Sequence, residues 1–257
     1  MCYKVSPKRI HASAKRKKGH LARTAFCALL AGGFCLGLGS QAMAQERVHS
    51  CHGMRLRNGD LIFQEACGGN TEDAIKSVTS SAEDYNFTHV GMVCIQGGEA
   101  YVLEATVPCV ALTPLRDFLY PETDSCPPVS VLARLKPEYR KLIPEALRLG
   151  LGHLGKSYDY AYVLGDDRYY CSELIYQILK DANHGKEVFP LNVMTFCDST
   201  GQVLPAWEDY FKQHSAPVPE GEAGINPGAM SRSSVLRLGR RLAVFNPKSN
   251  DRFGFIP

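Results

Sequence analysis

The stretch that most constrains the fold of this chain is a pair of strand-like runs joined by two glycines. Residues 87–95 (FTHVGMVCI) and 100–107 (AYVLEATV) are rich in β-branched and aromatic side chains, and Gln96-Gly97-Gly98-Glu99 separates them. A Gly-Gly pair between two such runs predicts a tight β-hairpin, because glycine adopts the positive φ angles of the favoured turns. The fold is therefore expected to contain an antiparallel sheet.

The hairpin also predicts which side chains share a face. If Gly97-Gly98 form a two-residue turn, Gly91 lies opposite Glu104, and His89 is the diagonal neighbour of Glu104. Diagonal Cα atoms are about 7–8 Å apart, within reach of a long carboxylate. A carboxylate beside a histidine orients the ring and favours the imidazolium, as in a catalytic base. A structural histidine in a half-buried strand is the alternative.

A second candidate is Cys171, at the start of the segment YYCSELIYQILKDA (169–182). Apolar residues recur there at helical spacing, so a helix is expected that begins near Cys171. A thiol at a helix N-terminus meets unpaired N–H groups and the positive end of the dipole, which favour the nucleophilic thiolate. A packed core thiol and a disulfide are the alternatives. Together, Cys171, His89 and Glu104 have the residue types of a thiol hydrolase triad.

The other segments predict a single α+β domain, without an internal repeat or a second core. Pro144 is expected either to kink the helix that contains it or to start its main segment. The chain becomes rich in Pro, Gly and Ser beyond Trp207. The further elements expected are strands at 58–64 and 127–135, helices at 70–81 and 138–155, and a returning strand within 232–245.

The first 44 residues predict a secretory signal peptide. A basic stretch precedes a short apolar run, and Ala42-Met43-Ala44 offers a cleavage site after Ala44. Eight of the 29 basic residues and none of the 26 acidic ones lie in this segment, so the mature chain has 21 against 26, a formal charge of −5. A negative net charge argues against binding to nucleic acid, so we exclude this class of function. The mature protein is expected in the periplasm or outside the cell, with no stable membrane span.

Cysteine usage agrees with export. Ten cysteines become seven when the signal peptide is removed, and an oxidising compartment permits disulfides. Proximity suggests the pairs Cys51–Cys67 and Cys109–Cys126, and the odd count leaves at least one thiol over. No CxxC or HxxxH spacing occurs, so neither a zinc site nor another metal site is expected.

Several motifs, taken in order, resemble those of a known family. GDLIF (59–63), THVGMV (88–93) and VLEA (102–105) are similar to the sheet half of the NlpC-like, papain-fold cysteine peptidases of bacterial cell walls. The segment 155–176, which ends in YYCSELIY, follows these strands instead of preceding them. That order resembles the circularly permuted, YiiX-like branch. The resemblance covers about residues 57–182 and extends more weakly to INPGAMSRSS (225–234).

The resemblance implies a permuted papain-like antiparallel half-barrel with a packed helix that carries Cys171. It implies a catalytic domain over 45–257, with its core at about 57–182 and a C-terminal extension at 183–257. It also implies hydrolysis of amide bonds in peptidoglycan stem peptides through a Cys171 thioester, without a cofactor. Tyr158 and Tyr170 become candidates for lining the cleft or donating to the oxyanion, although Tyr170 better fits a packing role.

Two other functions remain open. Permuted folds of this kind are also similar to lipid acyl hydrolases and acyltransferases; an apolar cleft favours that substrate, and a polar one with Arg or Lys favours peptidoglycan peptides. The second alternative is a disulfide-stapled binding module in which Cys171 is oxidised, because seven cysteines exceed the number expected for the branch. The sequence does not specify an oligomeric state.

Overall fold

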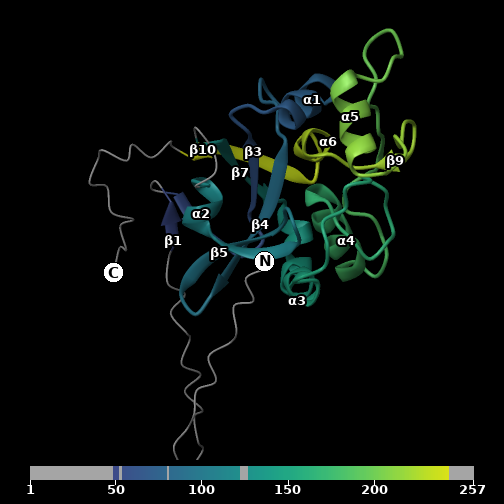
Figure 1. Cartoon of the computed structure of the whole chain (residues 1–257). Coiled ribbons are helices and arrows are strands. Elements are labelled where there is room, and N and C mark those ends of the chain that lie inside the picture. The colour runs from purple at the N-terminus through teal and green to yellow at the C-terminus, as the bar shows by residue number, and fades with distance from the viewer. Residues whose placement is uncertain (1–48, 52–53, 80, 122–126, 243–257) are drawn as a thin grey trace, which may run out of the picture. The chain divides into compact units, whose positions relative to one another are not determined.

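The computed structural model describes residues 49–51, 54–79, 81–121 and 127–242 (Figure 1). The predicted signal peptide, its cleavage site after Ala44 and Cys126 lie outside these residues.

A six-stranded antiparallel sheet forms the centre of the fold, in the order β10-β7-β3-β4-β5-β6. A separate short ribbon pairs β1 (His49–Cys51) with β2 (Met54–Leu56). The expected strands are all present, and the returning strand β10 pairs with β7. The sheet strands are β3 (Leu61–Glu65), β4 (His89–Gln96), β5 (Glu99–Ala105), β6 (Val110–Pro114), β7 (Val129–Leu135) and β10 (Leu236–Leu242).

The β4–β5 hairpin has the predicted register. Met92 pairs with Leu103 and Gln96 with Glu99, so Gly97 and Gly98 are the two turn residues. Their φ angles are +59° and +88°, values that other residues rarely adopt. The turn therefore sets the register, and the register sets the face on which each side chain lies.

Two helices cover one face of the sheet. The helix α4 (Cys171–Ala182) contacts β4 and β5, and α3 (Ile143–Gly152) packs beside it (Figure 1). The apolar stripe of α4 is fully buried, at Leu174, Ile175, Ile178 and Leu179. Pro144 lies in the first turn of α3, after a 3₁₀ helix η1 (Pro137–Leu142), so it starts the main segment and does not kink it.

The other face carries a smaller apolar cluster. Val93, Val102 and Ile62 pack there against the short helix α2 (Leu115–Leu119). Because neighbouring residues of a strand point to opposite faces, the two clusters divide the side chains of β4 and β5 between them.

The described part of the C-terminal extension, residues 183–242, packs against the rest of the fold. The helix α5 (Pro205–Gln213) contacts α1 (Asn70–Val78), and α6 (Pro227–Ser231) contacts α4. A two-residue pair, β8 (Asn192–Val193) with β9 (Ala223–Gly224), precedes α6. A third apolar cluster joins α1 to α5 through Ala74, Met194, Phe196, Trp207 and Phe211.

The described cysteines divide into two groups. Cys94, Cys171 and Cys197 are free thiols, whereas Cys67 and Cys109 are not. Cys126 and the side chain of Cys51 lie outside the described part of the chain, so the pairs Cys51–Cys67 and Cys109–Cys126 stay predictions. Of the helices described, none is both long enough and apolar enough to span a bilayer.

Candidate active site

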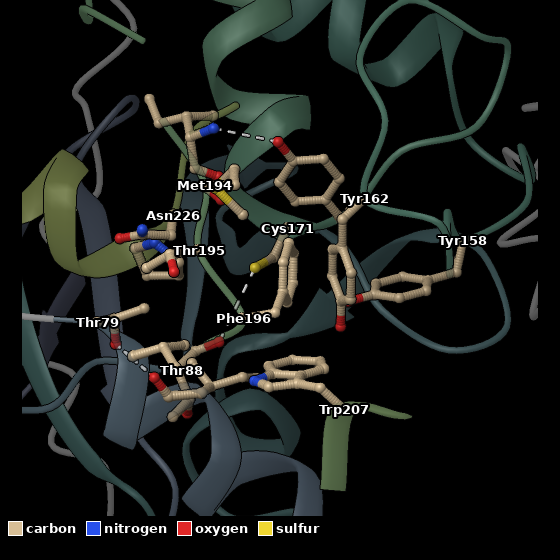
Figure 2. Close-up of a pocket in the computed structure, with 16 residues that line it drawn as sticks. Thr79, Thr88, Tyr158, Tyr162, Cys171, Met194, Thr195, Phe196, Trp207 and Asn226 are labelled. Carbon is tan, nitrogen blue, oxygen red and sulfur yellow. Dashed lines mark hydrogen bonds between the residues drawn. The ribbon is translucent and has the colours of Figure 1, made fainter. Parts of the chain in front are cut away.

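Cys171 is the first residue of α4. The preceding Tyr170 has an extended backbone, with φ −94° and ψ 170°, which places Cys171 in the first helical turn. Its side chain is buried, and its S–H lies 4.0 Å from the carbonyl oxygen of Thr88 (Figure 2). The thiol therefore sits at the positive end of the helix dipole, where an anion is stabilised.

His89 and Glu104 are in direct contact. His89 Nε2 lies 2.6 Å from Oε2 of Glu104, and the Oγ1 of Thr113 donates to the other carboxylate oxygen at 2.5 Å. Both oxygens of Glu104 are thus engaged, and only 5% of the residue is exposed. The carboxylate fixes the orientation of the imidazole.

His89 also lies beside Cys171, within range of a side-chain interaction with the thiol. Because Glu104 engages Nε2, the nitrogen that remains for the thiol is Nδ1. Burial disfavours the imidazolium, but hydrogen bonds and charge interactions with Cys171 and Glu104 outweigh that penalty and raise the pKa of His89 to about 10. The structure therefore brings the three predicted residues together in the order thiol, imidazole, carboxylate.

The thiol and the imidazole come from opposite faces of the sheet. The helix α4 packs on the face of Val90 and Met92, whereas His89 alternates with these residues and shares the face of Val93. The two side chains meet because His89 is the first residue of β4 and Cys171 the first residue of α4. The end of a strand thus meets the end of a helix.

Gly91 makes room for a side chain that supports the histidine. A Cβ atom at Gly91 would lie 2.3 Å from Cγ1 of Val102 and 3.2 Å from the ring of Phe118. The ring of Phe118 lies 5.7 Å from that of His89, centroid to centroid. A larger residue at position 91 would therefore displace the aromatic ring beside His89.

The two predicted tyrosines occupy different environments. Tyr158 lies close enough to Cys171 for a charge interaction, and it hydrogen-bonds to the side chain of Tyr162. Burial raises the pKa of the Tyr158 hydroxyl, so it stays protonated and able to donate. The hydroxyl of Tyr170 instead accepts the backbone N–H of Ile225 at 3.2 Å, and its ring packs edge-on against Tyr162.

Two cavities meet at these residues. The smaller has a volume of about 50 Å³ and is lined by Cys171 (Figure 2); the larger has a volume of about 600 Å³ and is lined by His89 and Glu104. Four residues line both of them, namely Ile75, Thr88, Tyr158 and Tyr162.

Sequence reasoning missed Thr113 and the side chains that enclose the thiol. Thr113 lies on β6, a strand that the sequence analysis does not predict. Met194, Phe196 and Trp207 line the small cavity from a region without a recognisable motif. Tyr162 has a φ angle of +54°, a value that tyrosine rarely adopts. Only the structure reveals this feature.

Two buried carboxylates hold the loop that leads to Cys171. Asp159 accepts the N–H groups of Ala161 and Val163, and Glu173 accepts those of Gly165 and Tyr170. Burial is the main reason that the pKa of Glu173 rises to about 8, with the charge of Asp159 adding to it. Among the described residues, no group of three or more His, Cys, Asp or Glu side chains is arranged to hold a metal ion.

The order of the elements and the site define a permuted papain-like fold with a Cys-His-Glu arrangement. Residues 55–238 match the model of the family described as "Permuted papain-like amidase enzyme, YaeF/YiiX, C92 family". The chain belongs to this family.

One curated relative and one solved structure agree with that assignment. The Escherichia coli K12 "Uncharacterized protein YiiX" is 30% identical over 127 residues, which span 49% of this chain and 58% of that protein. The structure titled "Crystal structure of metalloprotein yiiX from Escherichia coli O157:H7" is 24% identical, with a TM-score of 0.56. That match covers 72% of this chain and 97% of the solved chain, and it supports the fold.

Proposed function

We propose that the protein is an exported thiol hydrolase that cleaves amide bonds through a thioester on Cys171. The contact of His89 with both Cys171 and Glu104 is the observation that carries this proposal. Membership of an amidase family supports the class of reaction.

Before acylation, the thiol proton of Cys171 lies on Nδ1 of His89, because the raised pKa of His89 favours the thiolate–imidazolium pair. The thiolate then attacks the scissile carbonyl carbon and forms a tetrahedral oxyanion. The backbone N–H of Cys171 lies in the first turn of α4, where amide groups have no partner within the helix, so it is available to the oxyanion. Tyr158 is the side-chain donor that we assign beside it, because it lines the same cavity as Cys171 and burial raises the pKa of its hydroxyl.

The tetrahedral intermediate collapses when His89 gives its proton to the leaving amine. The acyl group is then held as a thioester on Cys171. In the second step His89 takes a proton from water, the hydroxide attacks the thioester carbonyl, and the thiolate leaves. Glu104 stabilises the imidazolium in both steps, and Thr113 keeps the carboxylate in place.

For the substrate we propose an amide bond of a peptidoglycan stem peptide. The resemblance to cell-wall peptidases and the predicted export support this choice. A second candidate is a lipid acyl group, because the described residues that line the small cavity carry no charged side chain. A disulfide-stapled binding module has less support, since Cys171 is a free thiol.

The decisive experiment incubates purified protein with peptidoglycan fragments and identifies the products by mass spectrometry. We expect the wild type to release a peptide and the variant Cys171→Ala to release none. Cys94→Ala is the matched control, because Cys94 is also a buried free thiol and lies on the hairpin away from both cavities. Undiminished turnover by Cys171→Ala would exclude the mechanism, and turnover of lipid acyl substrates alone would favour the second candidate.

A further inference from the structure

The two cavities divide the reacting groups between them. Among the described residues, Cys171 lines the small cavity and His89 lines the large one. The reaction proposed above assigns different parts of the substrate to these two groups, because the acyl part stays on the sulfur and the amine part takes the proton of the imidazolium.

The proton transfer determines which part of the substrate lies where. A general acid must lie within hydrogen-bond reach of the atom that it protonates. The leaving nitrogen must therefore lie beside His89, and the amine beyond it extends into the large cavity. The group on the other side of the scissile carbonyl is then directed into the small cavity beside Cys171.

The small cavity has a distinct chemical character. Val78, Met194, Phe196 and Trp207 form apolar parts of its wall, and Thr79 and Thr195 add uncharged polar groups (Figure 2). A carboxylate or ammonium group buried there would lose its hydration without finding an opposite charge, which is strongly unfavourable.

The size of this cavity limits its occupant as much as its polarity does. Its volume of about 50 Å³ is less than a tenth of the volume of the large cavity. A small side chain therefore suits this space better than a bulky one does. The large cavity, at about 600 Å³, has room for a bulky amine.

We propose that the small cavity is the acyl-side specificity pocket and that it selects a small, uncharged, apolar group attached to the scissile carbonyl. The preferred substrate is thus an amide with an alanine-like residue on the acyl side and a bulky amine on the other. This inference rests on the proposed function, since it assumes that Cys171 is the nucleophile and His89 the general acid.

Irreversible probes test the pocket independently of any natural substrate. Peptidyl chloromethyl ketones that end in alanine, phenylalanine or glutamate differ only in the side chain next to the reactive carbonyl, on its acyl side. The Cys171 sulfur displaces chloride from each, forming a thioether and releasing a chloride ion, and intact mass spectrometry gives the rate of alkylation. We expect the alanyl probe to react at least about ten-fold faster than the other two, the size of effect that a well-fitted apolar pocket produces.

The results separate the pocket from the proposed function. Equal rates for the three probes, or a faster glutamyl probe, would overturn the pocket assignment while leaving Cys171 as a nucleophile. Failure of all three probes to alkylate Cys171 would overturn both the pocket and the function.

Two variants and one control link the selectivity to the pocket wall. Met194→Ala enlarges the cavity and should raise the ratio of phenylalanyl to alanyl rates about ten-fold; Val78→Leu reduces the cavity and serves as a second test should Met194→Ala fail to fold. Met230→Ala is the matched control, because Met230 is equally a buried methionine but lines neither cavity. An unchanged ratio in both pocket variants would contradict the assignment.

Discussion

The hairpin β4–β5 and the segment from β8 to α6 both contribute side chains to the candidate site. Local turn geometry positions those of the hairpin, whereas packing between distant segments positions the others. The hairpin places His89 and Glu104 through local rules, since a two-residue turn determines the register and the register determines the face. The segment 192–227 contributes Met194, Phe196 and Trp207, and these side chains are held by packing against α1. Reactive groups can thus come from a locally specified element, while the walls of the pocket depend on contacts between distant parts of the chain.

The largest expected effect falls on the hairpin. His89→Ala removes the general base and acid, and we expect kcat to fall by about 10²–10⁴-fold, the range for a positioned proton-transfer group. The unfolding transition in urea should show that the variant stays folded. A loss of less than about five-fold would place the base elsewhere, because the uncatalysed proton transfer cannot sustain such a rate.

The next prediction concerns the segment 192–227 and the stability of the fold instead of the rate of the reaction. Phe211 is 1% exposed, packs against Trp207 and Tyr162, and lines neither cavity. Phe211→Ala should lower the free energy of unfolding by about 3–5 kcal/mol, measured by urea denaturation. Val193→Ala, in the same segment but 71% exposed, should change it by less than about 0.5 kcal/mol. Equal effects of the two variants would mean that the segment is not held by its buried cluster.

Glu104→Gln keeps the shape of the side chain and removes its charge. We expect kcat to fall by about 10²-fold, because the imidazolium loses the carboxylate that stabilises it. The pKa of His89 should fall as well, since a hydrogen bond and a charge interaction with Glu104 are among the influences that raise it. The pH profile of kcat/KM measures this shift. An unchanged profile would mean that the contact of Glu104 with His89 has no role in catalysis.

The raised pKa of His89 also predicts how stability depends on pH. The folded value of about 10 lies above the ordinary value of 6.5, so the folded state holds the proton more tightly than the unfolded state. The stabilisation is fully present below pH 6.5 and is lost as the pH rises towards 10. The difference in unfolding free energy between the wild type and His89→Gln should therefore narrow over that window, as followed by urea denaturation at several pH values. A difference independent of pH would exclude the predicted linkage.

The smallest effect is expected at Thr113, which acts only through Glu104. Thr113→Val removes the O–H donor at nearly constant volume, and kcat should fall by about ten-fold, which corresponds to the lower end of the range for one hydrogen bond to a charged group. KM should stay the same, because Thr113 supports the carboxylate and does not bind substrate in this scheme. Thr113→Ser should restore the rate, and its failure to do so would indicate a packing role for the side chain.

Much of the fold was accessible from the sequence because its signals are local. The Gly-Gly turn, the apolar stripe of α4 and the order of the motifs correctly predicted the hairpin, the packed helix and the permuted family. Pro144 left two possibilities, and the structure shows that it starts α3. The strand β6 was missed because its residues 110–114 follow Pro108 and carry little periodic pattern.

By itself, the sequence determined that a histidine and a glutamate share one face of a hairpin and that a cysteine begins a helix, since turn geometry and helix periodicity act over a few residues. Only the tertiary structure decided that the two would meet, because His89 and Cys171 belong to elements on opposite faces that come together at their ends. The tertiary structure also decided what surrounds the thiol. The side chains of the small cavity come from α1, from the loop before α4 and from the segment 192–227, and burial of apolar surface between distant segments has no signature in any one of them.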